Sequence, residues 1–139
     1  MACPPDAPGI TLARAAQGLI GVPFRLHGRD AGTGLDCLGL IGAALGITGR
    51  PMALPHDYSL RMRTLDSLPR LAEAAGLISV QGPMLAGDIL LLNPGPCQFH
   101  LGVVAEDLGL IHAHAGLHRV VHSPLPQDPI IERWRLPAT

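Results

Sequence analysis

Lysine is absent from this chain of 139 residues, so all ten of its Lys/Arg-type positive charges are arginines. A chain without lysine cannot use a lysine general base or a lysine Schiff base. The formal net charge of -1 also provides no basic surface of the kind that holds nucleic acid or an acidic membrane. The charge balance therefore predicts neither nucleic acid nor membrane as a partner.

Aromatic side chains and cysteines are also scarce. Only 3% of the residues are aromatic although 47% are hydrophobic, so the core must consist mainly of Leu, Ile, Val and Ala. The three cysteines are too few, and odd in number, for a disulfide framework. We therefore expect a reducing compartment and a core held by aliphatic packing.

The chain lacks a long apolar run and a basic N-terminal leader. Its apolar runs are interrupted by glycine well short of the roughly 20 residues that cross a bilayer. Residues 1–10 carry no basic side chain and contain three prolines, so we expect no signal peptide and a protein that is cytoplasmic as synthesised. The length predicts a single domain, placed at residues 10–139 after a loose arm at residues 1–9.

The period of the apolar residues changes once along the chain, from helical to extended. Helical spacing predicts helices over residues 11–20, 37–46 and 67–75, with a loop between the first two. Short β-prone runs follow at residues 77–80, 88–92, 101–106, 110–115, 119–123 and 130–136. Because the helices come first and the strands last, we expect an α+β fold. Its helices would pack on a C-terminal antiparallel sheet or small open barrel.

A cysteine stands where the second helix is expected to begin. Asp36 is a good N-cap for this helix, and Cys37 falls in its first turn. The unpaired N–H groups and positive dipole end there favour a thiolate, which predicts a lowered pKa for Cys37. The Asp36 charge opposes this effect, so a second cation such as an imidazolium is expected nearby. Cys37 is therefore a candidate nucleophile.

Histidines gather among the expected strands. A hairpin around residues 107–109 brings His112 beside His100 if both face the same way. His100 would then take the proton of Cys37, and His112 would hold His100 in the required tautomer. His114 points the same way as His112 along the strand, so the choice between these two stays open. His114, His118 and His122 are expected to be exposed.

Four short motifs follow one another between residues 21 and 113. They are Gly21-Val22-Pro23-Phe24, Asp36-Cys37-Leu38-Gly39-Leu40, Gly87-Asp88-Ile89, and His100-Leu101-Gly102-Val103-Val104 with Ile111-His112-Ala113. In this order they resemble the NlpC-type cysteine peptidases, bacterial and phage enzymes that cut peptidoglycan stem peptides. The short form, with a Gly-Arg-Asp loop before the cysteine, most resembles the phage-tail and prophage branch.

The resemblance implies a papain-like fold and a catalytic triad of Cys37, His100 and His112. It also implies that Asp36 belongs to the substrate-binding surface and that the backbone N–H of Cys37 helps form an oxyanion hole. The implied bond joins γ-D-glutamate to diaminopimelate in a stem peptide or a related γ-glutamyl peptide, and no cofactor is needed. The implied partners are phage-tail-like assembly proteins, through which the protein would reach the cell wall.

The chain departs from the family pattern at two positions. Phe24 stands where the family usually has tyrosine, and Leu38 stands where it commonly has serine. The missing tyrosine hydroxyl removes a donor to substrate or oxyanion, for which Tyr58 and His27 are candidate replacements. We therefore place Phe24 and Tyr58, with Asp36, on the expected substrate-binding surface.

Two other functions fit the same residues. A zinc ion could be bound by four ligands, Cys97, His100, His112 and His114. Alternatively, the domain could be a catalytically inactive structural or wall-binding piece of a phage tail, because fold and function separate readily. The zinc hypothesis leaves the organisation of the helix at Cys37 unexplained.

Overall fold

A computed structural model describes residues 8–49, 67–95 and 98–137 of the chain. Within these residues the helices are α1 (Pro8–Gln17), α2 (Cys37–Ile47) and α3 (Ser67–Ala74). The main sheet consists of β3 (Ile78–Ser79), β4 (Ile89–Gly95), β5 (Gln98–Val104), β6 (Leu110–His114), β7 (Arg119–Ser123) and β8 (Ile130–Arg135). All its strand pairs are antiparallel, in the order β3-β8-β4-β5-β6-β7. The expected α+β fold is confirmed.

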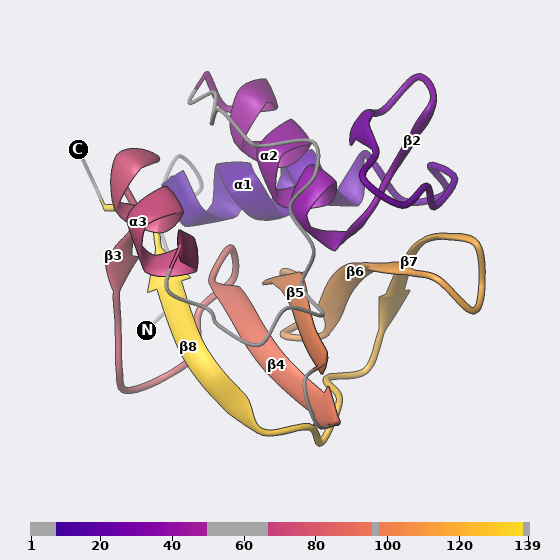
Figure 1. The fold of residues 1–139 in the computed structure, drawn as a ribbon. Coiled ribbons are helices and arrows are strands. Elements are labelled where there is room, and N and C mark those ends of the chain that lie inside the picture. Colours follow the sequence, from indigo (N-terminus) through magenta and orange to yellow (C-terminus); the bar gives the residue numbers. More distant parts are fainter. Residues whose placement is uncertain (1–7, 50–66, 96–97, 138–139) are drawn as a thin grey trace.

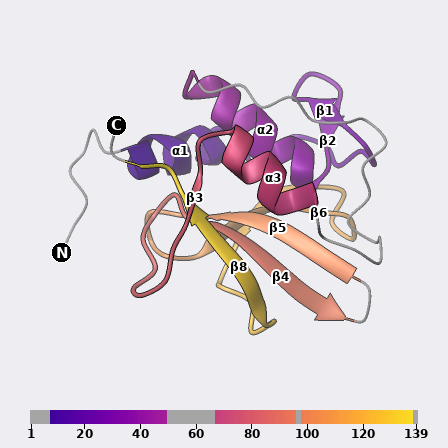
Figure 2. The same ribbon diagram turned by 60° about the vertical axis from the view of Figure 1, so that its left-hand side comes forward.

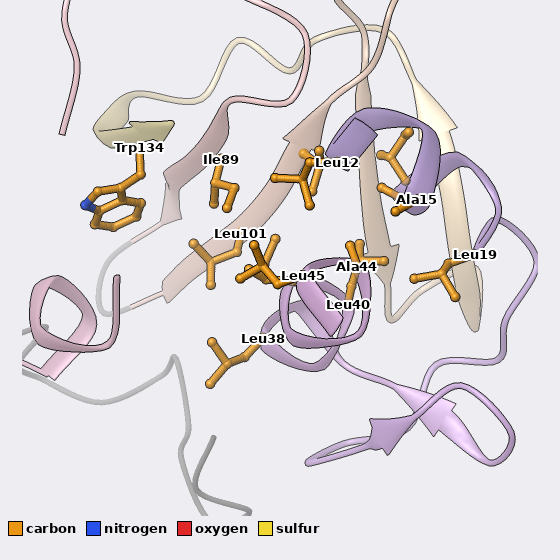
Figure 3. Close-up of a cluster of buried hydrophobic side chains, with 14 of the residues drawn as sticks. Leu12, Ala15, Leu19, Leu38, Leu40, Ala44, Leu45, Ile89, Leu101 and Trp134 are labelled. Carbon is orange, nitrogen blue, oxygen red and sulfur yellow. The ribbon is translucent and has the colours of Figure 1, made fainter. Parts of the chain in front are cut away.

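The helices gather on one side of the sheet (Figures 1 and 2). Their side chains and one face of the sheet form the main core. Figure 3 shows Leu12 of α1 and Leu45 of α2 meeting Ile89 of β4 and Leu101 of β5. As the composition predicts, this core is largely aliphatic, and Trp134 is its one tryptophan. A second, smaller hydrophobic cluster lies on the other face of the sheet and includes Leu90 and Leu92 of β4. Ile89 and Leu91 of the same strand belong to the main core, so β4 is apolar on both faces.

Helix α1 begins earlier than expected. Its first residue is Pro8, whose fixed φ and missing N–H suit the first position of a helix. Residues 8 and 9, assigned to the loose arm from sequence, therefore belong to the helix, and residues 1–7 lie outside the described part. The helix also ends earlier, at Gln17, before a turn that leads to Gly21 at a φ of 94°.

Helix α2 is the central helix and is buried along most of its length. Asp36 is its N-cap, as expected, and its side chain accepts a hydrogen bond from the backbone N–H of Gly39 at 2.8 Å. Leu40, Ala44 and Leu45 are completely buried. Helix α2 packs on β5 and β6, the two strands that carry His100 and His112.

A second, two-stranded sheet precedes α2. It joins β1 (Arg29–Asp30) to β2 (Gly34–Leu35) within the stretch expected to be a loop. The two strands, Arg-Asp and Gly-Leu, contain no β-branched residue and lie in a glycine-rich stretch of mixed charge, which is why the sequence did not reveal them. Gly34 has a φ of 140°, which side chains other than glycine rarely adopt.

The Gly87-Asp88 motif ties the sheet to its neighbouring loop. The carboxylate of Asp88 is fully buried and accepts hydrogen bonds from Arg135 at 2.7 and 2.9 Å and from the backbone N–H of Leu85 at 3.0 Å. A second arginine, Arg133, lies 3.8 Å away. Asp88 is thus a structural residue of the strand start. No helix among the described residues is long and apolar enough to cross a membrane.

Candidate active site

Two imidazoles and a hydroxyl form a chain of hydrogen bonds across three neighbouring strands. Nε2 of His100 on β5 lies 2.8 Å from Nδ1 of His112 on β6. The other ring nitrogen of His112, Nε2, lies 2.9 Å from Oγ of Ser123 on β7. The Ser123 hydroxyl donates to the carbonyl oxygen of Pro124 at 2.9 Å. The hairpin around residues 107–109 therefore brings His112 beside His100, as the sequence predicts.

Cys37 lines the same cavity as the two histidines. This cavity has a volume of about 1250 Å³, and its wall includes Phe24, Asp36, Cys37, His100, His112 and Ser123. Within the described residues, the His100 ring makes its hydrogen bond to His112 alone, so its Nδ1 atom has no such partner. The structure thus places the Cys37 and His100 side chains in the lining of one cavity.

Burial decides the acidity of the thiol. It raises the pKa of Cys37 to about 12, because the surrounding protein disfavours the charged thiolate. This value includes two smaller effects: the backbone N–H of Leu101 lowers the pKa in part, and the negative charge of Asp36 raises it. The expectation that the helix N-terminus lowers the pKa of Cys37 is therefore wrong, since desolvation outweighs the helix end.

The two histidines are neutral at pH 7. Burial, and to a smaller extent the positive charge of His114, lower the pKa of His100 to about 4. Burial also lowers the pKa of His112 to about 4, with repulsion from His100 and His114 adding to the effect. The imidazolium expected beside Cys37 is therefore not the resting form. The free protein holds a thiol and a neutral imidazole rather than an ion pair.

Asp36 uses its carboxylate to hold the start of α2 in place. Besides the hydrogen bond from the N–H of Gly39, the carboxylate accepts hydrogen bonds from the backbone N–H of His27 at 3.0 Å and from Nη1 of Arg29 at 2.6 Å. The Asp36 and Arg29 side chains are each 10% exposed, so this is a largely buried ion pair. Asp36 nevertheless lines the cavity, beside Cys37. The pair fixes the position of the residue that precedes the thiol.

The two departures from the family pattern both lie at the cavity. Phe24 is half-buried, lines the wall and bridges to Leu35 of β2. Leu38 is 2% exposed, so its side chain belongs mainly to the core. His27 also lines the wall. Tyr58, the other candidate for the missing hydroxyl, lies outside the described residues.

His114 has a different partner from His112. Its Nδ1 atom accepts the backbone N–H of Leu117 at 3.0 Å, and its ring centre lies 5.7 Å from that of His112. His122 pairs instead with Asp107 at 2.9 Å, and both His114 and His122 reach the cavity wall. His118 is exposed, as expected, whereas His114 is half-buried.

The described residues do not support a zinc site. Among them, no group of three or more His, Cys, Asp or Glu side chains is arranged to hold a metal ion. Cys97, one of the four suggested ligands, lies outside this part of the chain.

Sequence reasoning did not identify Ser123 or the partner of Arg29. The β6–β7 register places His112 opposite Val121, so Ser123 is its diagonal neighbour on the same face. Counting this register from the turn after His114 would have identified the serine. The Arg29–Asp36 contact carried no comparable signal, because it depends on how the loop folds back over α2.

No protein-family model and no curated protein sequence matches the chain. Its fold is nevertheless similar to those of solved structures. NlpC2 from Trichomonas vaginalis matches 96% of this chain and 48% of its own, with a TM-score of 0.70 and 17% identity. NlpC1 from Trichomonas vaginalis matches 94% and 44%, with a TM-score of 0.68 and 20% identity. The chain thus spans about half the length of these two proteins.

A third similar structure is the NlpC/p60 domain of the peptidoglycan hydrolase SagA. It matches 84% of this chain and 88% of that domain, with a TM-score of 0.56 and 26% identity. All three neighbours carry the NlpC or NlpC/p60 name and have the same arrangement of helices on an antiparallel sheet. The chain therefore has the α+β, papain-like fold of NlpC/p60 domains.

Proposed function

We propose that the protein is a cysteine peptidase that hydrolyses an amide bond in peptidoglycan stem peptides. The observation that carries the proposal is the 2.8 Å contact between His100 and His112 in a cavity that Cys37 also lines. A thiol nucleophile, an imidazole base and a group that orients the base are the parts required for acyl transfer through a thioester.

The reaction begins from the neutral pair. The His100 imidazole takes the proton of Cys37 as the sulfur attacks the amide carbonyl carbon, and the developing oxyanion lies at the N-terminus of α2, near the backbone N–H of Cys37. The C–N bond then breaks, and His100 returns the proton to the leaving amine. Water, deprotonated by His100, hydrolyses the thioester and releases the thiol. Proton transfer and attack are coupled, because burial makes a resting thiolate unfavourable.

The proposed substrate is the γ-D-glutamyl-diaminopimelate bond of a stem peptide, or a related γ-glutamyl amide. Two observations support it: the order of the four sequence motifs, and the similarity of the fold to a domain of a peptidoglycan hydrolase. Phe24 and Asp36 line the cavity and form part of the proposed binding surface, to which we also assign Tyr58. The Gly-Arg-Asp loop supports delivery by a phage-tail-like particle.

The test is incubation of the wild type and Cys37→Ala with purified Gram-negative peptidoglycan and with soluble stem peptides. New amino termini are identified by mass spectrometry. We expect cleavage by the wild type and a loss of about 10⁴-fold or more in Cys37→Ala, as for removal of other catalytic nucleophiles. Cys97→Ala is the matched control, because it removes a thiol that the proposed reaction does not use.

Other outcomes identify the alternatives. Loss of cleavage in Cys97→Ala together with one bound zinc per chain would favour the zinc site. Peptidoglycan binding without cleavage by the wild type would favour an inactive wall-binding domain. Either result would overturn the peptidase proposal.

A further inference from the structure

We propose that Ser123 is a positioning residue that sets the direction of every hydrogen bond between itself and His100. It thereby leaves Nδ1 of His100 as the nitrogen that accepts the proton of Cys37. The hydrogen-bond directions follow from the contacts on β5, β6 and β7 alone. Their consequence for catalysis rests on the proposed function.

The hydrogen bond that fixes these directions lies at the end of β7. Oγ of Ser123 lies 2.9 Å from the carbonyl oxygen of Pro124, and two oxygens at this distance need a proton between them. A carbonyl has no proton to donate, so the single hydroxyl proton of Ser123 must lie in this contact. The same Oγ atom can therefore only accept the hydrogen bond that joins it to His112 at 2.9 Å.

This constraint passes through the ring of His112. Because Oγ accepts, Nε2 of His112 carries a proton. The ring is neutral, so its Nδ1 atom has a lone pair. That atom lies 2.8 Å from Nε2 of His100, which must therefore be the protonated nitrogen of that pair. In a neutral His100 ring the lone pair is then on Nδ1, the nitrogen without a hydrogen-bond partner in the described structure.

The opposite pattern would block the reaction. If Nδ1 of His112 carried the proton, it would donate the hydrogen bond to Nε2 of His100. The proton of the neutral His100 ring would then be on Nδ1. No lone pair would then be available to take the proton of Cys37. A neutral serine that donates to His112 would produce this pattern, and the Pro124 carbonyl prevents it.

The position of the carbonyl is a consequence of the sequence. Strand β7 ends at Ser123, and the next residue, Pro124, has no N–H with which to continue the ladder. The Pro124 carbonyl thus lies outside the β6–β7 pairing, where the serine hydroxyl reaches it. Ser123 followed by Pro124 therefore acts as one unit.

The test compares Ser123→Thr with Ser123→Val, two side chains of the same shape that differ in the hydroxyl. Ser79→Ala is the matched control, because Ser79 also lies in a strand and donates to a side chain, that of Glu132, away from the cavity. Thermal melting confirms that each variant is folded. The primary measurement is the ¹⁵N chemical shift of both histidine rings at pH 7, which distinguishes the protonated nitrogen without any substrate.

We expect Nε2-protonated rings for His100 and His112 in the wild type, Ser123→Thr and Ser79→Ala. In Ser123→Val the His112 signals should shift toward a mixture of the two tautomers, with a loss of about 10-fold or more in peptide cleavage. An Nδ1-protonated His112 in the wild type would overturn the proposal, as would unchanged ring shifts in Ser123→Val. If the ring shifts behave as expected but the wild type cleaves no peptide, the proposed function alone fails.

Discussion

Gly39, in the first turn of α2, packs directly against the backbone carbonyl of Gly28 in the loop before β1. An added Cβ at Gly39 would overlap this carbonyl oxygen, so no larger side chain fits without moving the helix or the loop. The absence of a side chain at Gly39 therefore lets the first turn of α2 approach this loop closely. The contact fixes the first turn of α2, where Cys37, two residues earlier, lines the cavity with His100 and His112.

Gly39→Ala should destabilise the protein and displace Cys37, the proposed nucleophile. We expect a loss of about 1–3 kcal/mol in the free energy of unfolding, the usual cost of overpacking, and a larger loss of activity than that instability explains. Gly46→Ala is the control in the same helix, since nothing lies within 4 Å of its added Cβ. Gly46→Ala should be neutral or stabilising by up to about 1 kcal/mol. Equal effects of the two substitutions in urea unfolding would refute the close contact.

The alkylation rate of Cys37 should depend on pH without a plateau. Because burial raises the pKa of Cys37 to about 12, each unit of pH from 7 to 10 should increase the thiolate, and hence the iodoacetamide rate, about tenfold. The measurement uses a chain in which Cys3 and Cys97 are alanine. The same chain unfolded in urea should level off near the ordinary thiol pKa. A plateau in the folded protein between pH 5 and 8 would instead indicate a resting thiolate.

His112 and His114 should differ in their effect on activity. His112→Ala removes the partner of His100 and should lower peptide cleavage by about 10²-fold or more. His114→Ala removes a ring that bonds to the backbone of Leu117, so its effect should stay within about fivefold. Cleavage rates of the two purified variants decide between them. A larger loss in His114→Ala would assign the third triad position to that residue.

Arg135 pairs with a buried carboxylate and Arg14 with an exposed one. Replacing these two arginines should therefore change the free energy of unfolding by different amounts. Arg135→Met leaves the fully buried carboxylate of Asp88 without its two short contacts and should cost about 3–5 kcal/mol. Arg14→Met breaks a surface pair with Glu106, in which the side chains are 59% and 48% exposed, and should cost less than about 1 kcal/mol. Urea unfolding of both variants measures the difference. Similar losses would mean that Arg133 replaces Arg135 beside Asp88.

Patterns of apolar residues that extend over a whole helix or strand made most of the fold predictable. The apolar spacing located α2 and its cap at Asp36, and the short β-prone runs after residue 77 located all six strands of the main sheet. Strand β7 was placed at its observed bounds, Arg119–Ser123. Strands β1 and β2 were missed because they contain no β-branched residue and lie in a glycine-rich stretch of mixed charge. The start of α1 was misplaced because Pro8 was taken as part of an arm.

The sequence by itself determined the chemical groups of the candidate site: a thiol after a helix cap and histidines on neighbouring strands. Only the tertiary structure decided their states and partners. Burial raises the pKa of Cys37, against the local effect of the helix end, because desolvation depends on every surrounding element. His112, not His114, meets His100, and Ser123 and Arg29 find partners 11 and 7 residues away, because these contacts depend on strand register and loop path. Neither the strand register nor the loop path can be deduced from the residues next to these side chains in the sequence.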